Sequence, residues 1–189
     1  MNEQKIYVLL TDTGTLLTRM IKLYTKDPYN HASISFDPHL VNVYSFGRKT
    51  VSNPFIGGFV KENMRDNIFK QARCAIYSCN VTSDQLQKMR YYIEQIEAEK
   101  HLYRYNFLGL FAVTFNKRMV RKNAFFCSEF VATVLQDCNV TGYKKVSSLV
   151  TPNDLIENAS FQLEYEGNLE DFYKQMELQP SVELAYMRI

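Results

Sequence analysis

The predicted architecture depends on one segment, Phe125-Phe126-Cys127-Ser128-Glu129-Phe130-Val131-Ala132-Thr133-Val134-Leu135. Apolar side chains recur at one-face helical spacing from Phe130 to Cys138, which predicts a largely buried helix. Cys127 then lies in the first turn of that helix. The free N–H groups and positive end of a helix N-terminus favour a thiolate, the reactive form of cysteine. Cys127 is therefore either an activated nucleophile or a buried structural cysteine, which is the commoner kind of free thiol.

A histidine-bearing segment well before Cys127 offers a partner for the thiol. Residues 29–36 and 41–47 read as two short strands, joined by a tight turn at Asp37-Pro38-His39. His31 opens the first strand. A histidine at a strand start, a polar residue on the partner strand and a cysteine opening a buried helix form a set of base, orienting residue and nucleophile.

These segments resemble a known family when they are taken in order. The similarity is to the circularly permuted branch of the NlpC-type papain-like superfamily, the YiiX/YaeF-like amidases, with lecithin:retinol acyltransferase as a more distant relative. It extends from about residue 5 to residue 167 and rests on an ordered set of strings: Tyr29-Asn30-His31-Ala32-Ser33-Ile34, Val43-Tyr44-Ser45-Phe46, Tyr105-Asn106-Phe107, Phe126-Cys127-Ser128-Glu129-Phe130-Val131 and Thr151-Pro152-Asn153-Asp154-Leu155.

The resemblance implies an α+β fold in the permuted papain-like arrangement, with an antiparallel sheet of about five to six strands and packed helices. It also implies Cys127 as the nucleophile and His31 as the base. The third catalytic position of the family, usually Glu, His or another strong polar group, falls on Ser45. A serine can orient the imidazole but supplies no negative charge to an imidazolium. Asn42 is the alternative, although its odd spacing from Ser45 predicts that it faces the other side of the strand.

An oxyanion hole would need the Cys127 N–H and one further donor. By resemblance Tyr105 lines the substrate site, although an aromatic core residue is an equal interpretation, and Ser128 is a further candidate. His39 is expected to be exposed in its turn, and His101 ends a helix, where a basic residue suits the dipole. Residues 116–123 form a basic cluster that is either a solvated loop or, at the cleft, a site that favours an anionic substrate or the thiolate.

Several other elements follow from pattern. Thr82 and Gln85 predict a capping box for a helix that extends to about Lys100. Gly142 is predicted to end the nucleophile helix in a left-handed turn. Residues 61–71 are predicted to be a polar connection. Further strands are expected at residues 6–10, 55–60, 73–80 and 161–167, and further helices at 16–26 and from Thr151-Pro152 onward.

Composition limits the class of protein. The chain has 189 residues, of which 46% are apolar and 22% charged, so we expect one domain over residues 1–189 with a C-terminal extension at 168–189. A net charge of +2 does not argue for a nucleic-acid partner. No apolar run approaches the length of a transmembrane helix, so stable membrane insertion is not expected, and no signal peptide is evident. The oligomeric state is left open.

Four cysteines without a paired framework suggest reduced thiols and a cytoplasmic location. Cys74 and Cys79 should face opposite sides of a strand. No cofactor and no metal site are expected. The predicted function is a cysteine amidase or peptidase that acts through an acyl-thioester on a small peptide, amide or acyl-lipid. Acyl transfer, or lipid acyl hydrolysis, at the same site is one alternative. A non-catalytic binding module is another, favoured by the weak third residue Ser45.

Overall fold

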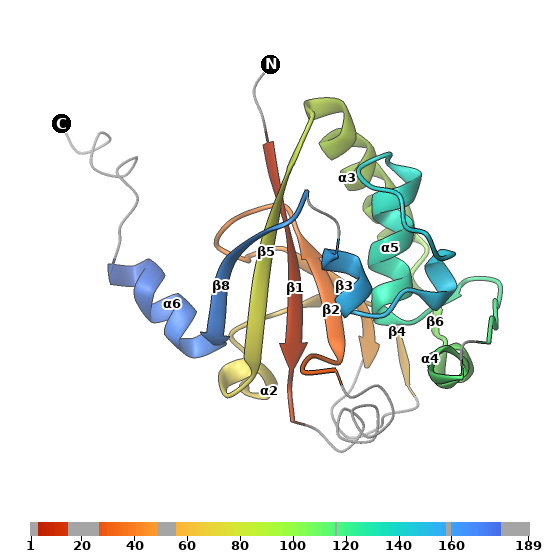
Figure 1. Cartoon of the computed structure of the whole chain (residues 1–189), viewed down its shortest axis with the longest axis horizontal. Coiled ribbons are helices and arrows are strands. Elements are labelled where there is room, and N and C mark those ends of the chain that lie inside the picture. The colour runs from red at the N-terminus through yellow and green to blue at the C-terminus, as the bar shows by residue number, and fades with distance from the viewer. Residues whose placement is uncertain (1–3, 15–26, 49–55, 116, 158–159, 179–189) are drawn as a thin grey trace.

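The computed structural model describes all residues except 1–3, 15–26, 49–55, 116, 158–159 and 179–189. Its described strands form an antiparallel sheet of six, in the order β4-β3-β2-β1-β5-β8 (Figure 1). A further two short strands, β6 and β7, form a parallel pair. The strand bounds are β1 Gln4–Asp12, β2 His31–Ser35, β3 Val43–Arg48, β4 Gly57–Glu62, β5 Arg73–Val81, β6 Arg104–Tyr105, β7 Ala124–Phe125 and β8 Gln162–Asn168. The predicted α+β class and antiparallel sheet are confirmed.

Helices lie on both sides of the sheet (Figure 1). Their bounds are α2 Asn67–Lys70, α3 Ser83–Ala98, α4 Phe107–Thr114, α5 Cys127–Asp137 and α6 Leu169–Leu178, with short 3-10 helices η1 Ser147–Leu149 and η2 Asn153–Ile156. The predicted helix at 16–26 lies outside the described residues. Within the described part of the chain, no helix is both long and apolar enough to cross a bilayer.

The sheet separates two apolar cores because side chains alternate between its faces. Cys79 of β5 belongs to the larger core, beneath α3 and α5, whereas Cys74 belongs to the smaller core, beneath α2 and α6. The two cysteines therefore face opposite sides, as predicted. All four cysteines are free and buried.

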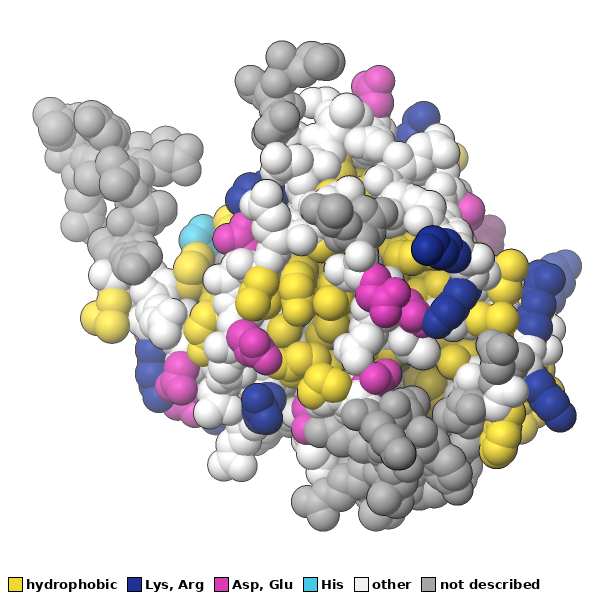
Figure 2. Space-filling view, in the orientation of Figure 1, with side chains coloured by type: hydrophobic (Ala, Val, Ile, Leu, Met, Phe, Trp, Pro, Cys, Tyr) yellow, Lys and Arg dark blue, Asp and Glu magenta, His cyan; other side chains and the backbone are white. Residues whose placement is uncertain are grey.

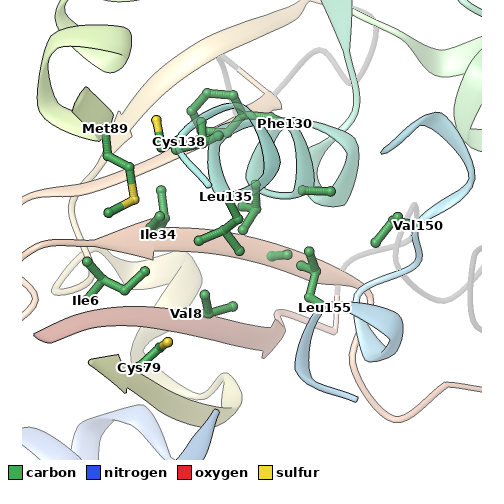
Figure 3. Close-up of a cluster of buried hydrophobic side chains, with 14 of the residues drawn as sticks. Ile6, Val8, Ile34, Cys79, Met89, Phe130, Leu135, Cys138, Val150 and Leu155 are labelled. Atoms are coloured by element: carbon green, nitrogen blue, oxygen red, sulfur yellow. The ribbon is translucent and has the colours of Figure 1, made fainter. Parts of the chain in front are cut away.

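Helix α5 is the central element of the larger core. Phe130 and Leu135 are fully buried against the sheet, where they meet Ile34 of β2 and Val8 of β1 (Figure 3). Burying each of these large side chains contributes about 1.5–3 kcal/mol. This packing fixes the first residue of the helix, Cys127, against the sheet.

The start of α3 agrees with the capping residues predicted from the sequence, whereas the end of α5 does not. Thr82 and Gln85 form the predicted capping box at the start of α3, with reciprocal hydrogen bonds of 3.2 and 2.9 Å. The C-terminal end of α5 differs from the prediction. Asn139 (φ 55°) takes the left-handed conformation there, while Gly142 does not. Asparagine tolerates that conformation better than most residues, so the turn comes three residues earlier than the glycine suggested.

One further prediction needs correction. Strand β4 spans Gly57–Glu62 and α2 follows at Asn67–Lys70, although residues 61–71 were expected to be a polar connection. The side chains of this stretch that face the protein are too few to form a clear apolar repeat. Within the predicted C-terminal extension, residues 169–178 form α6, whose Leu169 and Phe172 are buried in the smaller core.

Candidate active site

The Cys127 thiol lies at the first residue of α5 and is only 2% exposed. Burial alone would raise its pKa. The hydrogen bond and positive charge of the His31 imidazole oppose this, as do backbone hydrogen bonds from Ala32 and Ser128, and together they hold the pKa of the Cys127 thiol below its ordinary value. The thiolate form is favoured here.

His31 lies between the thiol and a carboxylate. Its Nε2 atom is 2.7 Å from Glu62 Oε1, and both side chains are largely buried. Burial alone would lower the pKa of the imidazole, but the negative charge of Glu62 and the hydrogen bonds to Cys127 and Glu62 hold that pKa well above its ordinary value. Since the carboxylate occupies Nε2, Nδ1 is the ring nitrogen left for the thiol. The site is therefore arranged for a thiolate beside an imidazolium.

Ser45 does not occupy the predicted orienting position. Its hydroxyl is fully buried and makes no hydrogen bond with any described residue. The register that pairs Ile34 with Tyr44, continued along the two strands, puts Gly47 rather than Ser45 opposite His31. The orienting group comes from the next strand along, β4, where Glu62 reaches His31 on the far side of β3.

A glycine at position 47 leaves room for this arrangement. A Cβ atom at Gly47 would lie 3.7 Å from Glu62 Oε1 and 3.5 Å from Ser45 Oγ. Glu62 therefore lies directly beside the backbone of β3 at the point opposite His31. Asn42, the alternative orienting residue, precedes β3 and has its backbone N–H bonded to Asp37 Oδ2 at 3.1 Å.

Sequence reasoning missed Glu62 because it ended the strand at residue 60. The available signal was weak, since Val60-Lys61-Glu62 continues a strand with one more alternation and closes it with an acid. An acid at a strand end is ordinarily solvated. Only the strand order β4-β3-β2 puts this one beside His31.

The oxyanion candidates have different roles. The Ser128 hydroxyl donates to the Val150 carbonyl at 2.7 Å, so it ties α5 to the following loop, while the Ser128 N–H is directed at the Cys127 sulfur. Tyr105 lies in β6, and its ring packs edge-on against Phe107 with centroids 4.6 Å apart. Tyr105 packs partly against the larger core, in line with the aromatic core interpretation.

A narrow cavity of about 20 Å³ adjoins Cys127. That volume holds roughly one or two water molecules or a small group. The lining is mainly apolar and includes Tyr29, Leu110, Val113, Phe126 and Pro152.

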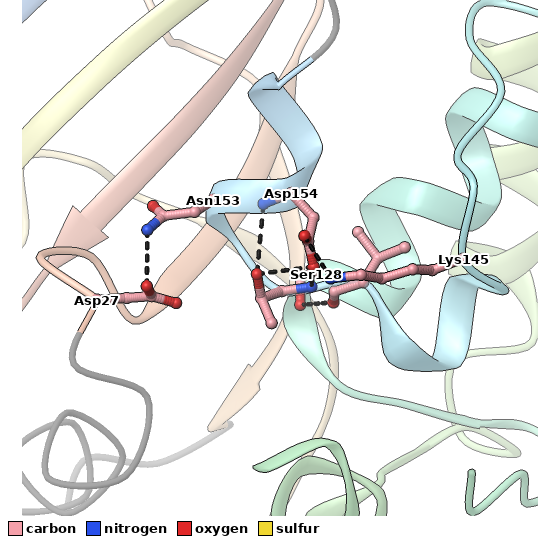
Figure 4. A network of polar contacts seen from close by, with 7 residues as sticks. Asp27, Ser128, Lys145, Asn153 and Asp154 are labelled. Atoms are coloured by element: carbon pink, nitrogen blue, oxygen red, sulfur yellow. Dashed lines mark hydrogen bonds and ion pairs between the residues drawn. The ribbon is translucent and has the colours of Figure 1, made fainter. Parts of the chain in front are cut away.

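A polar network fixes the Thr151–Pro152 wall of this cavity (Figure 4). Asp154 accepts hydrogen bonds from the Thr151 N–H at 2.8 Å and from Lys145 Nζ at 2.6 Å. Asn153 donates to Asp27 at 2.8 Å, which joins the wall to the segment just before His31. The Thr-Pro-Asn-Asp string thus begins the short helix η2 rather than a longer one, and its polar side chains hold the cavity wall in place.

Glu129 is a second acid near the thiol, on the same helix turn. It is 4% exposed, and burial raises the pKa of its carboxyl to about 7 against hydrogen bonds from the Phe126 N–H and the Asn106 side chain. The Phe126 bond, at 3.3 Å, is part of the start of α5. The contacts of Glu129 are therefore with the helix start and α4, whereas His31 contacts Glu62.

The other histidines are exposed, His39 in its turn and His101 after α3. The described residues contain no group of three or more His, Cys, Asp or Glu side chains that could hold a metal ion. Comparisons of the chain with models of protein families, with curated proteins and with solved structures each found no match. The site is therefore interpreted from its own chemistry.

Proposed function

We propose that the protein is a cysteine hydrolase that cleaves amide bonds through an acyl-thioester. One observation carries the proposal: a buried thiol, an imidazole and a carboxylate, drawn from α5, β2 and β4, form a continuous chain of contacts. A structural cysteine needs no such partners. Perturbed ionisable groups with specific charge partners at a cavity are typical of catalytic sites.

The reaction follows from the placement of the protons. The Cys127 thiolate attacks the acyl carbon, and the His31 imidazolium gives its proton to the leaving amine as the C–N bond breaks. His31, now neutral, takes a proton from a water molecule that attacks the thioester. The C–S bond breaks, the carboxylic acid leaves, and the thiolate and imidazolium are restored. Throughout, Glu62 holds the imidazole orientation and stabilises its charged form.

The permuted papain-like arrangement is part of the proposal. The support is the chain order of His31, Glu62 and Cys127, with the cysteine at the N-terminus of a helix packed on an antiparallel sheet, together with the sequence resemblance to the YiiX/YaeF-like amidases. The usual third residue of that family, a strong polar group, has its chemical counterpart in Glu62. This carboxylate also removes the main reason for a non-catalytic binding module, which rested on the weakness of Ser45.

Acyl transfer is the second candidate because the same thioester serves both reactions and only the acceptor differs. The apolar, roughly 20 Å³ cavity beside Cys127 favours a small apolar group next to the scissile bond in either case. A peptide or amide substrate would place only one small group in this cavity, which is too small for a long acyl chain.

Alkylation of Cys127 by iodoacetamide as a function of pH tests the proposed ion pair. The wild-type rate should stay high well below the ordinary thiol pKa of about 8.5, and His31→Ala should move the apparent pKa upward. Cys127→Ser identifies labelling at the three other cysteines. A wild-type thiol that reacts only above its ordinary pKa, as in His31→Ala, would contradict the proposal.

The chemistry is tested by mass spectrometry of the intact protein after incubation with activated amides and esters. We expect an acyl adduct on Cys127 that decays in water, and no adduct in Cys127→Ser. Adding amine or alcohol acceptors separates the two reactions, since an acyltransferase would hand the group to the acceptor faster than to water. Absence of any adduct across the donor set would contradict both.

A further inference from the structure

Charge is distributed unevenly along the chain in a way that the candidate site does not use. Residues 100–128 contain six Lys or Arg residues and no Asp or Glu. The whole chain has 22 basic and 20 acidic residues, so the remainder holds 16 basic and 20 acidic residues and has a net charge of −4. The basic excess is thus confined to the stretch that forms β6, α4 and the loop before Cys127.

Apolar side chains are exposed in the same stretch. Helix α4 is apolar along its length, a composition typical of buried helices, yet Leu108 on it is 56% exposed. Phe115 at its C-terminal end is 68% exposed, and Val120 and Met119 in the following loop are 58% and 41% exposed. Several large apolar side chains exposed on one helix and the loop that follows it are typical of an interaction site.

The basic and apolar side chains together form what we call the α4 surface, which comprises Leu108, Phe115, Met119, Val120, Lys117, Arg118, Arg121 and Lys122. None of its four basic side chains forms an ion pair with another described residue. Figure 2 shows lysine and arginine side chains beside hydrophobic ones at the right-hand edge of the molecule, the side on which α4 lies.

This loop is held in place by backbone bonds. The Lys117 N–H donates to Ala112 at 2.8 Å, and the Arg104 N–H donates to Asn123 at 2.9 Å. The buried Asn106 side chain donates to the Met119 carbonyl at 3.0 Å. Both ends of the loop are therefore tied to α4 and β6, so the exposed side chains project from a fixed backbone.

We propose that the α4 surface docks the protein on an anionic lipid membrane. Basic side chains are attracted to anionic headgroups, while Phe, Leu, Met and Val enter the boundary between headgroups and acyl chains. A nucleic acid or an acidic protein surface could bind the basic side chains, but it would leave the exposed apolar side chains in water. The proposed docking is peripheral, with these side chains at the headgroup region of the membrane.

Docking would also orient the candidate active site. Leu110 and Val113, on the same helix as Leu108, line the cavity beside Cys127. The membrane would then lie next to that cavity. The docking proposal goes beyond the proposed function and stands without it, since it needs no reaction at Cys127.

The test is co-sedimentation of the full chain with phosphatidylcholine vesicles that contain or lack phosphatidylserine. We expect binding only to the anionic vesicles, weakening as salt rises. Changing Lys117, Arg118, Arg121 and Lys122 together to Gln should reduce partitioning by two orders of magnitude or more, since each charge is worth about fivefold. The matched control changes Arg73, Lys70, Lys88 and Lys144 to Gln, which alters net charge equally elsewhere and should reduce binding far less.

A second variant, Phe115→Ser with Val120→Ser, separates a membrane from other acidic partners. It should lower vesicle binding by about tenfold or more while its salt dependence is kept. Unchanged binding would overturn the entry of the apolar side chains into the membrane, and with it the argument for a lipid surface over any other acidic surface. Equal loss in the control variant, or equal binding to neutral vesicles, would overturn the docking surface itself. Urea unfolding of each variant checks that the fold is intact.

Discussion

The carboxylate of Glu62 changes what the His31 imidazole can do. A neutral hydroxyl at that place would orient the ring, but a carboxylate also stabilises the positive charge that develops on it. Because the thiolate depends on that charge, the effect of Glu62 passes through His31 to Cys127. The separation of 2.7 Å between Nε2 and Oε1 is that of a strong, charge-assisted hydrogen bond.

Glu62→Gln should keep the shape of the site and remove its negative charge. A hydrogen bond to a charged group contributes about 1.5–3 kcal/mol, so we expect the rate of Cys127 acylation to fall by roughly 10- to 100-fold. The pKa of the Cys127 thiol should rise and the pKa of the His31 imidazole should fall. The pH range in which thiolate and imidazolium coexist, and in which the protein reacts, should therefore narrow at both ends. Rates measured across pH for wild type and variant check this.

Ser45→Ala is the matched comparison. Since the Ser45 hydroxyl is buried without a described partner, its removal should change the acylation rate by less than about threefold. Stability should be unchanged or higher by about 1 kcal/mol, because a buried unpaired hydroxyl is lost. A loss as large as that of Glu62→Gln would return the orienting role to Ser45.

Glu129 should make stability depend on pH. Its carboxyl has a pKa of about 7 in the folded protein against an ordinary 4.5, so the folded state holds the proton more tightly than the unfolded chain. The free energy of unfolding should therefore fall as pH rises from about 4.5 to 7, by on the order of 3 kcal/mol. Glu129→Gln should remove this slope and be more stable than wild type at pH 8.

Urea unfolding of both proteins at pH 5 and pH 8 measures the Glu129 effect. The exposed Glu94→Gln on α3 is the control and should follow the wild-type curve. If Glu129→Gln destabilises the protein as much at pH 8 as at pH 5, the carboxyl acts as a charged cap of α5 rather than as a buried acid.

At the scale of elements, the sequence predicts best where one segment carries its own signal. The capping box of α3 and the buried α5 could be read from spacing alone, and α5 places Cys127 at a helix start. His31 at a strand start was predictable for the same reason. The partnership of His31 with Glu62 was not, because it depends on the register of β2 with β3 and on β4 lying next to β3. A strand shifted by one residue reverses every side chain.

Glu62 reaches His31 across β3, beside Gly47, so a larger side chain at Gly47 should disturb their contact. A β-branched side chain at Gly47 would occupy the space through which Glu62 reaches His31, so Gly47→Val should raise the Cys127 thiol pKa as Glu62→Gln does. Gly47→Ala is the matched control, because its Cβ would meet Ser45, Val60 and Glu62 atoms only at 3.5–3.7 Å, which is ordinary contact. Iodoacetamide rates across pH should separate the two variants. Equal reactivity would mean that Glu62 does not need the open strand surface.

At the scale of the whole molecule, the two faces of the sheet pack against different helices. The face beneath α3 and α5 holds the larger core and supports α5, which begins at Cys127, while the face beneath α2 and α6 holds the smaller core. Among the described residues, the start of α5 packs on the first face and in a small cluster of Leu110 and Phe126, whereas the second face packs against α2 and α6. Stability drawn from the second face should therefore be separable from the chemistry of Cys127.

Phe172→Ala in α6 tests this separation. Phe172 is 9% exposed, packs against Tyr165 and Tyr173 with ring centroids 5.2 and 5.5 Å away, and belongs to the smaller core. Its truncation should lower the free energy of unfolding by about 3 kcal/mol, with little change in the pH dependence of Cys127 alkylation in the folded protein. Leu178→Ala, at a residue 81% exposed on the same helix, should cost less than about 0.5 kcal/mol. Urea unfolding and alkylation measured on the same samples decide the matter: a Phe172→Ala protein that stays folded but loses thiolate character would show that the two faces are coupled through the sheet.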